Sequence, residues 1–289
     1  MENILFQGVC TALVTPFLGN QVNYPLAEIL VKRQIDAGIP AVVLAGTTGE
    51  APTLEDDEKL ELFARCKRYA AGDCKIICGT GSNCTAHAIA FSQAAQEAGA
   101  DGLLVVSPYY NKATPDGLVE HYMSIAHAVK LPIIAYNVPS RTGQDMSVSV
   151  YKRLSYIPNI VGVKEAADDA VKVTRTLHQT RPGFQVWSGN DSLAVAQIAL
   201  GAKGVISVLS NVFPRETIAM VDAALDGDFD TASALQQRLQ PVMDALCAEV
   251  NPIPIKAAMA LAGYDCGVCR LPLTRAKAST VELLKEFIL

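Results

Sequence analysis

A lysine lies at an unusual place in the sequence, directly after a run of apolar residues. Lys164 belongs to "IVGVKEA" at 160–166, whose first residues are typical of a short buried strand. Burial disfavours the charged form of an amine, and a neutral amine attacks carbonyl carbons to form a Schiff base. The alternative is a structural ion pair with Glu165 or another acid. Because successive strand residues point to opposite sides, Glu165 should face away, which favours a nucleophilic Lys164.

Three polar side chains near the ends of other apolar runs suit the same chemistry. Tyr136 is expected one strand earlier at a matching height, where it can pass protons to and from a carbinolamine. Thr47 offers a hydroxyl for such a relay, and Arg141 is a fixed cation that can bind a carboxylate. Taken singly, a core tyrosine and an ordinary surface arginine explain Tyr136 and Arg141 equally well.

Metal and phosphate chemistry have weaker support. The four histidines show no spacing typical of metal ligands, so no metal site is predicted; they are His87, His121, His127 and His178. We expect His121 and His127 on one helix. The sequence contains no G-x-S-x-G or P-loop pattern. A phosphate site in the loops after the last two apolar runs stays open as an alternative.

The eight cysteines do not suggest a disulfide framework in a chain of this length. Cys10, Cys66 and Cys78 lie in apolar stretches, where a free thiol behaves as a small hydrophobe. Cys266 and Cys269 have a spacing found in metal and redox sites, but no second pair accompanies them. We therefore expect reduced thiols and a reducing cytoplasm.

Eight continuously apolar runs alternate with longer amphipathic stretches. Continuous apolar character is typical of parallel strands that are covered on both faces. The runs occupy residues 8–17, 41–46, 75–80, 102–108, 132–138, 160–166, 185–190 and 204–210. Eight such units predict an α/β protein with a (β/α)8 TIM barrel. An open doubly wound sheet is the alternative, but the glycine-rich fingerprint it needs after the first strand is missing.

The amphipathic stretches carry helix signals. Thr53 with Asp56 predicts a capping box, and Thr114 with Pro115 predicts a cap followed by a first-turn proline. The sequence after residue 212 holds more helix than the last unit needs, in stretches at 230–250, 254–264 and 279–289. We expect a barrel over residues 1–225 and a helical appendix of the same domain over 226–289.

Composition excludes some partners. Half of the 289 residues are hydrophobic, and the net charge of −5 argues against nucleic acid and anionic membrane surfaces. No apolar run is long enough to span a membrane. The start "MENILFQG" lacks the features of a secretory signal, and it is either a tag remnant or a native lead into the first strand.

Five segments together resemble the dihydrodipicolinate synthases, which belong to the pyruvate-dependent class I aldolases and lyases. They are "GTTGE" at 46–50, "SPYYNK" at 107–112, "YNVPSRTG" at 136–143, "VGVKEA" at 161–166 and "SGND" at 188–191. The resemblance extends from "GVCTALVTPF" to "NPIPIKAAM" at 251–259. The arginine of "YNVPSRTG" is more specific to this family than the other motifs are.

The resemblance implies a catalytic set. Lys164 would form an imine with pyruvate, and the resulting enamine would attack aspartate 4-semialdehyde. Tyr136, Thr47 and Tyr110 would form the proton relay, with Tyr110 reaching in from a neighbouring subunit. That arrangement implies a homo-oligomer, usually a tetramer built as a dimer of dimers.

The resemblance also implies binding residues and a pathway. Thr48 would bind the pyruvate carboxylate, the backbone around Gly189 and Ile206 would line the pocket, and Arg141 would hold the semialdehyde carboxylate. No cofactor is needed. The product would feed the synthesis of diaminopimelate, lysine and cell-wall precursors in the cytoplasm.

The sequence departs from feedback-inhibited members of the family at their lysine effector site. Asn83 and Tyr109 of that site are retained. Where those members carry a glutamate, a histidine and a serine, this chain has His87, Lys59 and Ala51. Loss of a carboxylate and gain of a cation disfavour a cationic effector. We predict that lysine inhibits weakly or not at all.

Two other functions remain as alternatives. A sister lyase, such as an N-acetylneuraminate lyase or a keto-deoxy sugar acid aldolase, would share Lys164 and Tyr136. Arg141 weighs against it, because a sugar aldehyde offers hydroxyls where this residue expects a carboxylate. A non-catalytic sensor barrel would be expected to lose Lys164, Tyr136 or Tyr110, and all three are present.

Overall fold

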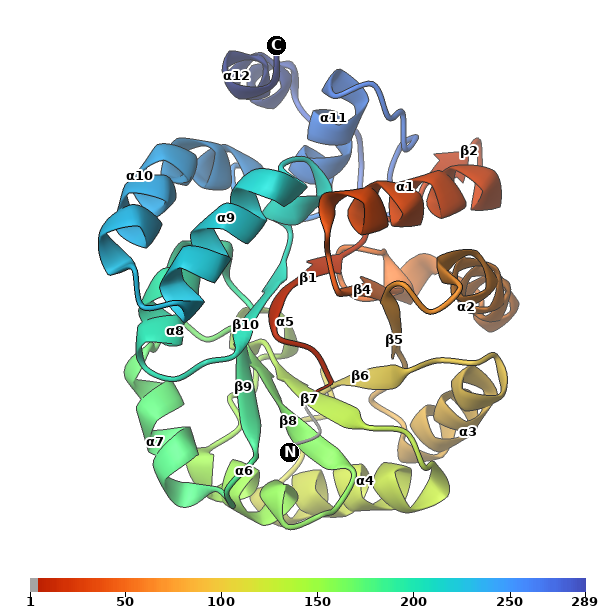
Figure 1. The fold of residues 1–289 in the computed structure, drawn as a ribbon. Coiled ribbons are helices and arrows are strands. Elements are labelled where there is room, and N and C mark those ends of the chain that lie inside the picture. Colours follow the sequence, from red (N-terminus) through yellow and green to blue (C-terminus); the bar gives the residue numbers. More distant parts are fainter. Residues whose placement is uncertain (1–4) are drawn as a thin grey trace.

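The computed structural model of the chain describes residues 5–289 and is built around a closed barrel of eight parallel strands (Figure 1). Around the barrel the strands follow the order β1-β10-β9-β8-β7-β6-β5-β4. Their bounds are β1 Gly8–Ala12, β4 Ala41–Leu44, β5 Lys75–Gly79, β6 Gly102–Val106, β7 Ile133–Asn137, β8 Ile160–Glu165, β9 Gln185–Ser188 and β10 Gly204–Ser207. All eight predicted strands are confirmed, and the open-sheet alternative is wrong.

Each strand ends before its apolar run does, because the last residues of the run enter the loop that follows. The difference is largest for the first run, of which only Gly8–Ala12 forms β1. The chain then forms a two-stranded antiparallel hairpin outside the barrel, β2 (Phe17–Leu18) with β3 (Gln21–Val22). The start "MENILFQG" is interpreted as a tag remnant or a native lead into the first strand. Its residues 1–4 lie outside the described residues, so this choice stays a prediction.

The strands are covered on both faces, as the continuous apolar runs require. On β4, Val42 packs toward the helices, whereas Val43 points into the barrel interior. On β6, Leu103 and Leu104 divide in the same way. Strand residues alternate between faces, so apolar residues at successive positions fill two separate cores.

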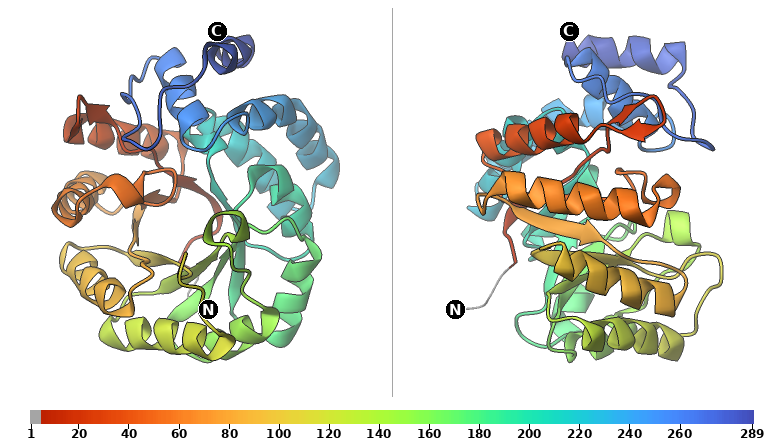
Figure 2. Two further views of the ribbon diagram at one scale, coloured as in Figure 1. Left: turned by 180° about the vertical axis from the view of Figure 1, so that it is seen from behind. Right: turned by 90° about the vertical axis from the view of Figure 1, so that its right-hand side faces the viewer.

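A ring of helices surrounds the barrel (Figures 1 and 2). The crossover helices are α1 Tyr24–Ala37, α2 Asp56–Ala70, α3 Thr85–Glu97, α4 Pro115–Ala128, α6 Val148–Ser155, α7 Val171–Gln179, α8 Ala194–Ala199 and α9 Pro214–Leu225. Short helices follow four of the strands: η1 Ala51–Thr53, α5 Pro139–Thr142, η2 Asp191–Leu193 and η3 Leu209–Asn211. Helix α5 lies over one end of the barrel.

Three further helices end the chain, as predicted: α10 Phe229–Leu246, α11 Ile253–Leu261 and α12 Ala278–Ile288. Helix α10 packs on α9, and α12 packs on α11 and α10 outside the ring (Figure 1). The division of the chain into a barrel over 1–225 and an appendix over 226–289 stays a prediction.

One of the two predicted helix caps is correct. Thr114 caps α4, where its hydroxyl accepts a hydrogen bond from the amide of Gly117, and Pro115 begins the helix. The predicted cap at Thr53 is wrong. Helix α2 is capped by Glu55, which exchanges hydrogen bonds with Glu58 as a capping box. Thr53 instead ends η1, and its hydroxyl donates to the carbonyl of Glu50.

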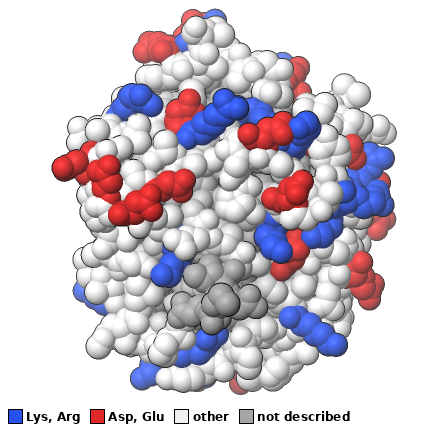
Figure 3. Space-filling model, in the orientation of Figure 1, with Lys and Arg blue, Asp and Glu red and all other residues white. Residues whose placement is uncertain are grey.

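No helix within residues 5–289 is both long and apolar enough to cross a membrane. On the face drawn in Figure 3, basic and acidic side chains are interspersed, and no continuous basic patch forms there.

Candidate active site

Lys164 and Tyr136 lie side by side on neighbouring strands. They are direct register partners between β8 and β7, so the predicted matching height is confirmed. Both are almost fully buried, with 5% of Lys164 and 6% of Tyr136 exposed. The Nζ atom of Lys164 lies 4.4 Å from the centre of the Tyr136 ring. The barrel therefore places a buried amine directly against a phenol.

Glu165 faces away from Lys164, as the strand alternation predicts. Its carboxylate accepts hydrogen bonds from Asn137 (2.7 Å) and Tyr151 (2.6 Å) and pairs with Lys172 at 3.1 Å. Lys164 makes no ion pair with any residue of the 5–289 segment. The alternative of a structural pair between Lys164 and Glu165 is wrong, because the two side chains lie on opposite sides of β8.

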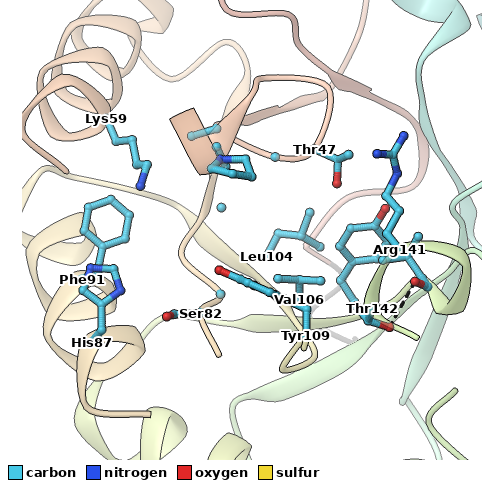
Figure 4. Close-up of a pocket in the computed structure, with 18 residues that line it drawn as sticks. Thr47, Lys59, Ser82, His87, Phe91, Leu104, Val106, Tyr109, Arg141 and Thr142 are labelled. Atoms are coloured by element: carbon cyan, nitrogen blue, oxygen red, sulfur yellow. Dashed lines mark hydrogen bonds between the residues drawn. The ribbon is translucent and has the colours of Figure 1, made fainter. Parts of the chain in front are cut away.

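A cavity of about 430 Å³ opens at the carboxyl ends of the strands (Figure 4). Thr47, Tyr136 and Arg141 line one part of it, so three residues predicted from separate loops and strands share one cavity. Lys164 does not line the cavity itself. Its amine lies over the ring of Tyr136, which does.

Thr48 and Arg141 are joined through a residue that the sequence analysis did not single out. The side-chain amide of Asn251 donates to the hydroxyl of Thr48 at 3.0 Å. The guanidinium of Arg141 donates to the backbone carbonyl of Asn251 at 3.1 Å. Asn251 belongs to the motif at 251–259, but its distance along the chain gives no sign that it lies here.

Gly189 lies against Lys164, and Ile206 lies in the barrel interior. The amide of Gly189 donates to the carbonyl of Glu165 at 2.7 Å. A side chain at Gly189 would place its Cβ 3.1 Å from Cε of Lys164 and 2.6 Å from Cβ of Ala166. Glycine is therefore needed for this close approach. Ile206 is buried in the barrel interior in the same cluster as Tyr136.

Cys10 is a further buried neighbour of this group. It pairs in register with Ile206 and lies in the same interior cluster. Burial raises the pKa of the Cys10 thiol well above its ordinary value, the charge of Cys74 raises it further, and the nearby charge of Lys164 opposes the shift. The thiol is therefore protonated at neutral pH, and it fills space beneath the site as a small apolar group.

Tyr110 is not brought to Lys164 within a single chain. Its side chain is 93% exposed, and its backbone adopts the left-handed conformation with φ of 69°. The preceding residue, Tyr109, lines the cavity. The loop after β6 thus turns one tyrosine toward the site and the other into solvent.

The residues of the predicted effector site line the other part of the same cavity. Lys59, His87, Ala51 and Tyr109 are among them, whereas Asn83 is not and instead accepts a hydrogen bond from Asn111 through its carbonyl. The effector group therefore adjoins the catalytic group.

Asp56 and Phe91, whose place at the site was not predicted, organise this cluster. Asp56 bonds Lys59 at 3.1 Å and His87 at 2.7 Å. The Lys59 ammonium lies 5.0 Å from the centre of the Phe91 ring, and His87 stacks on the same ring (Figure 4). Helices α2 and α3 bring these groups together, so spacing in the sequence carried no sign of them.

The structure also places the remaining histidines and cysteines of interest. His121 and His127 share helix α4, as expected. No group of three His, Cys, Asp or Glu within residues 5–289 could hold a metal ion. Cys266 and Cys269 are free thiols, and burial raises their pKa values to about 12 and about 11.

Comparison with known proteins finds relatives over nearly the whole chain. A model of the dihydrodipicolinate synthetase family matches residues 5–288. A 4-hydroxy-tetrahydrodipicolinate synthase of Kosmotoga olearia is 46% identical over 285 residues, covering 98% of this chain and 97% of the relative.

Solved structures are equally similar. A dihydrodipicolinate synthase from Aquifex aeolicus has a TM-score of 0.95 and 42% identity, with 97% of this chain and 96% of that chain covered. A structure described as the first monomeric dihydrodipicolinate synthase variant has a TM-score of 0.96 and 40% identity, with 98% and 95% covered. Matches of this extent place the chain in the dihydrodipicolinate synthetase family.

Proposed function

We propose that this protein is a 4-hydroxy-tetrahydrodipicolinate synthase, which condenses pyruvate with L-aspartate 4-semialdehyde. The observation that carries the proposal is the buried Lys164 amine lying 4.4 Å from the centre of the Tyr136 ring, without a counter-ion among residues 5–289. An amine held in this way is suited to attack a carbonyl carbon. The names of the relatives support the choice of substrates.

In the proposed reaction, the Lys164 amine adds to the keto carbon of pyruvate, and loss of water gives an imine. Loss of a proton from the methyl group gives an enamine, whose carbon attacks the aldehyde of the second substrate. Tyr136 and Thr47 line the same cavity and pass protons in these steps, together with Tyr110 from a second subunit. No cofactor is required.

Each substrate carboxylate has a proposed partner. The hydroxyl of Thr48 binds the carboxylate of pyruvate, and the backbone around Gly189 and Ile206 lines the pocket. Arg141 binds the carboxylate of the semialdehyde, because a guanidinium matches a carboxylate in a bidentate way. Lys164 cannot neutralise either charge while it is an imine, so these fixed groups must.

The test is borohydride trapping with pyruvate, followed by mass spectrometry of the digested protein. We expect a reduced adduct on Lys164, and condensation when the semialdehyde is added. The variant Lys164→Met should give neither. An adduct without condensation would replace the proposal by a sister lyase. If the wild type gave no adduct at all, the Schiff-base chemistry would be wrong.

We further propose that the protein is a cytoplasmic homo-oligomer, with a tetramer as the expected form, in the pathway to diaminopimelate and lysine. The outward position of Tyr110 supports a second subunit, because this tyrosine has no access to the site of its own chain. The effector cluster of Lys59 and His87 supports weak inhibition by lysine or none.

A further inference from the structure

The segment between α10 and α11 crosses from the C-terminal helices to the mouth of the barrel. There Asn251 contacts two loops at once. Its side-chain amide donates to Thr48 after β4, and its carbonyl accepts from Arg141 after β7. One residue of the C-terminal helical part thus meets both side chains to which we assign a substrate carboxylate.

A buried ion pair fixes this segment against the loop that carries Thr48. Lys256 on α11 bonds Glu50 at 2.7 Å, and both side chains are almost fully buried. The second carboxylate oxygen of Glu50 accepts a hydrogen bond from the backbone amide of Arg270 at 2.9 Å. Since Glu50 lies two residues after Thr48, the position of Asn251 relative to Thr48 is held rigidly from both sides.

The direction of the hydrogen bond from Asn251 determines what Thr48 can do. A hydroxyl has one proton to donate and two lone pairs to accept with. Because the Asn251 amide donates to Thr48, the hydroxyl proton of Thr48 remains available. No residue of the described chain takes it, as the bond from Asn251 is the only hydrogen bond of the Thr48 side chain within residues 5–289.

We propose that Asn251 is a positioning residue that keeps Thr48 a hydrogen-bond donor toward the carboxylate of pyruvate. The inference rests on the proposed function, since it assigns that carboxylate to Thr48. A carboxylate only accepts hydrogen bonds, so a donating Thr48 binds it and an accepting Thr48 repels it. Besides filling space, the amide of Asn251 thus determines whether Thr48 donates or accepts in its contact with the carboxylate.

Asn251→Asp tests this directly, because it preserves shape and reverses the hydrogen bond. The aspartate would accept the Thr48 proton, which turns the threonine oxygen toward the substrate. We expect the KM for pyruvate to rise about tenfold or more, since a hydrogen bond to a charged group is lost. Asn251→Ala should raise it less. The KM for the semialdehyde should change little in Asn251→Ala, because Arg141 contacts the backbone of residue 251.

Controls separate this effect from folding and from added charge. Asn23→Asp adds the same charge at the N-cap of α1, where aspartate is an equally good cap, and should leave both KM values unchanged. In a Thr48→Val background, Asn251→Ala should have no further effect on pyruvate. If Asn251→Asp did not fold, the effects of Asn251→Ala with threonine and with valine at position 48 would still test the proposed role of Asn251.

The inference would be overturned by an Asn251→Asp variant with the KM of the wild type for pyruvate. It would also be overturned if Asn251→Ala weakened pyruvate binding equally with threonine and with valine at position 48. Trapping of pyruvate on Lys164 in the wild type is a separate measurement. If no adduct formed, the proposed function would be refuted, whereas an adduct together with unchanged KM values in Asn251→Asp would refute only the role of Asn251.

Discussion

The cluster of Lys59, His87, Asp56 and Phe91 shows how single residues change what a cavity can bind. Asp56 already bonds both Lys59 and His87, and the Lys59 ammonium lies over the aromatic ring. The chain's own cation therefore occupies the positions that attract a cation, namely a carboxylate and a ring face. A free amino acid with an ammonium group would have to compete with it.

We predict that lysine inhibits the condensation weakly or not at all, and that the double variant Lys59→His/His87→Glu becomes sensitive. The exchange removes a cation and adds a carboxylate, which should lower the half-inhibitory lysine concentration about tenfold or more. A lysine titration of initial rates measures it. His178→Glu, on the exposed face of α7, makes the same histidine-to-glutamate exchange elsewhere and should have no effect. Half-inhibition of the wild type at low lysine concentration would contradict the prediction.

At the scale of elements, the site depends on how β7 and β8 are joined. Tyr136 pairs with Lys164, and the next register pair is Asn137 with Glu165. The second pair faces outward, where Asn137 donates to Glu165 at 2.7 Å. Tyr151, Lys172 and the backbone amide of Ala167 are the other partners of this buried carboxylate. The network on the outside of the barrel thus fixes the two strand ends that carry the chemistry on the inside.

Glu165→Gln should therefore lower both stability and kcat. The amide leaves Lys172 without one of its two acidic partners and directs a donor at groups that donate. Breaking a buried pair costs about 3 kcal/mol, so we expect a loss of that order in the free energy of unfolding.

Urea denaturation and initial rates measure these two effects. Glu282→Gln, in an exposed pair with Lys285, serves as the control and should change stability by less than about 1 kcal/mol. A Glu165→Gln variant as stable and as active as the control would show that the network does not position the site.

At the scale of the whole molecule, one chain holds the cavity, Lys164 and Tyr136, whereas Tyr110 points outward. Its exposed ring and left-handed backbone leave it available to another copy of the chain. If a second subunit supplies Tyr110, the proton relay is complete only in the oligomer. A structure described as a monomeric variant has the same fold, so the fold alone does not decide the question.

Subunit mixing tests whether Tyr110 acts across subunits. Tyr110→Phe and Lys164→Met should each have low activity alone, and activity should return when the two are unfolded and refolded together. In a mixed dimer, one site then combines an intact Lys164 with an intact Tyr110 from its neighbour. Sedimentation velocity checks that mixed assemblies form. If they form and no activity returns, Tyr110 acts within its own chain or not at all.

The sequence by itself determined the barrel and the central pair of residues. Continuous apolar runs define buried parallel strands, and eight of them leave few ways to close a sheet. The two-residue period of a strand was sufficient to turn Glu165 away from Lys164. These inferences succeed because they depend on neighbours along the chain.

Only the tertiary structure decided which distant residues meet. Asn251 bonds Thr48 across 203 positions, and Lys256 bonds Glu50 across 206. Asp56 lies between Lys59 and His87 because α2 packs beside α3. No periodic pattern in the sequence predicts such contacts, because closure of the barrel and docking of the C-terminal helices bring these residues together. Helix α2 is capped by Glu55 and not by the predicted Thr53, because Thr53 belongs to η1 and its hydroxyl donates to the carbonyl of Glu50.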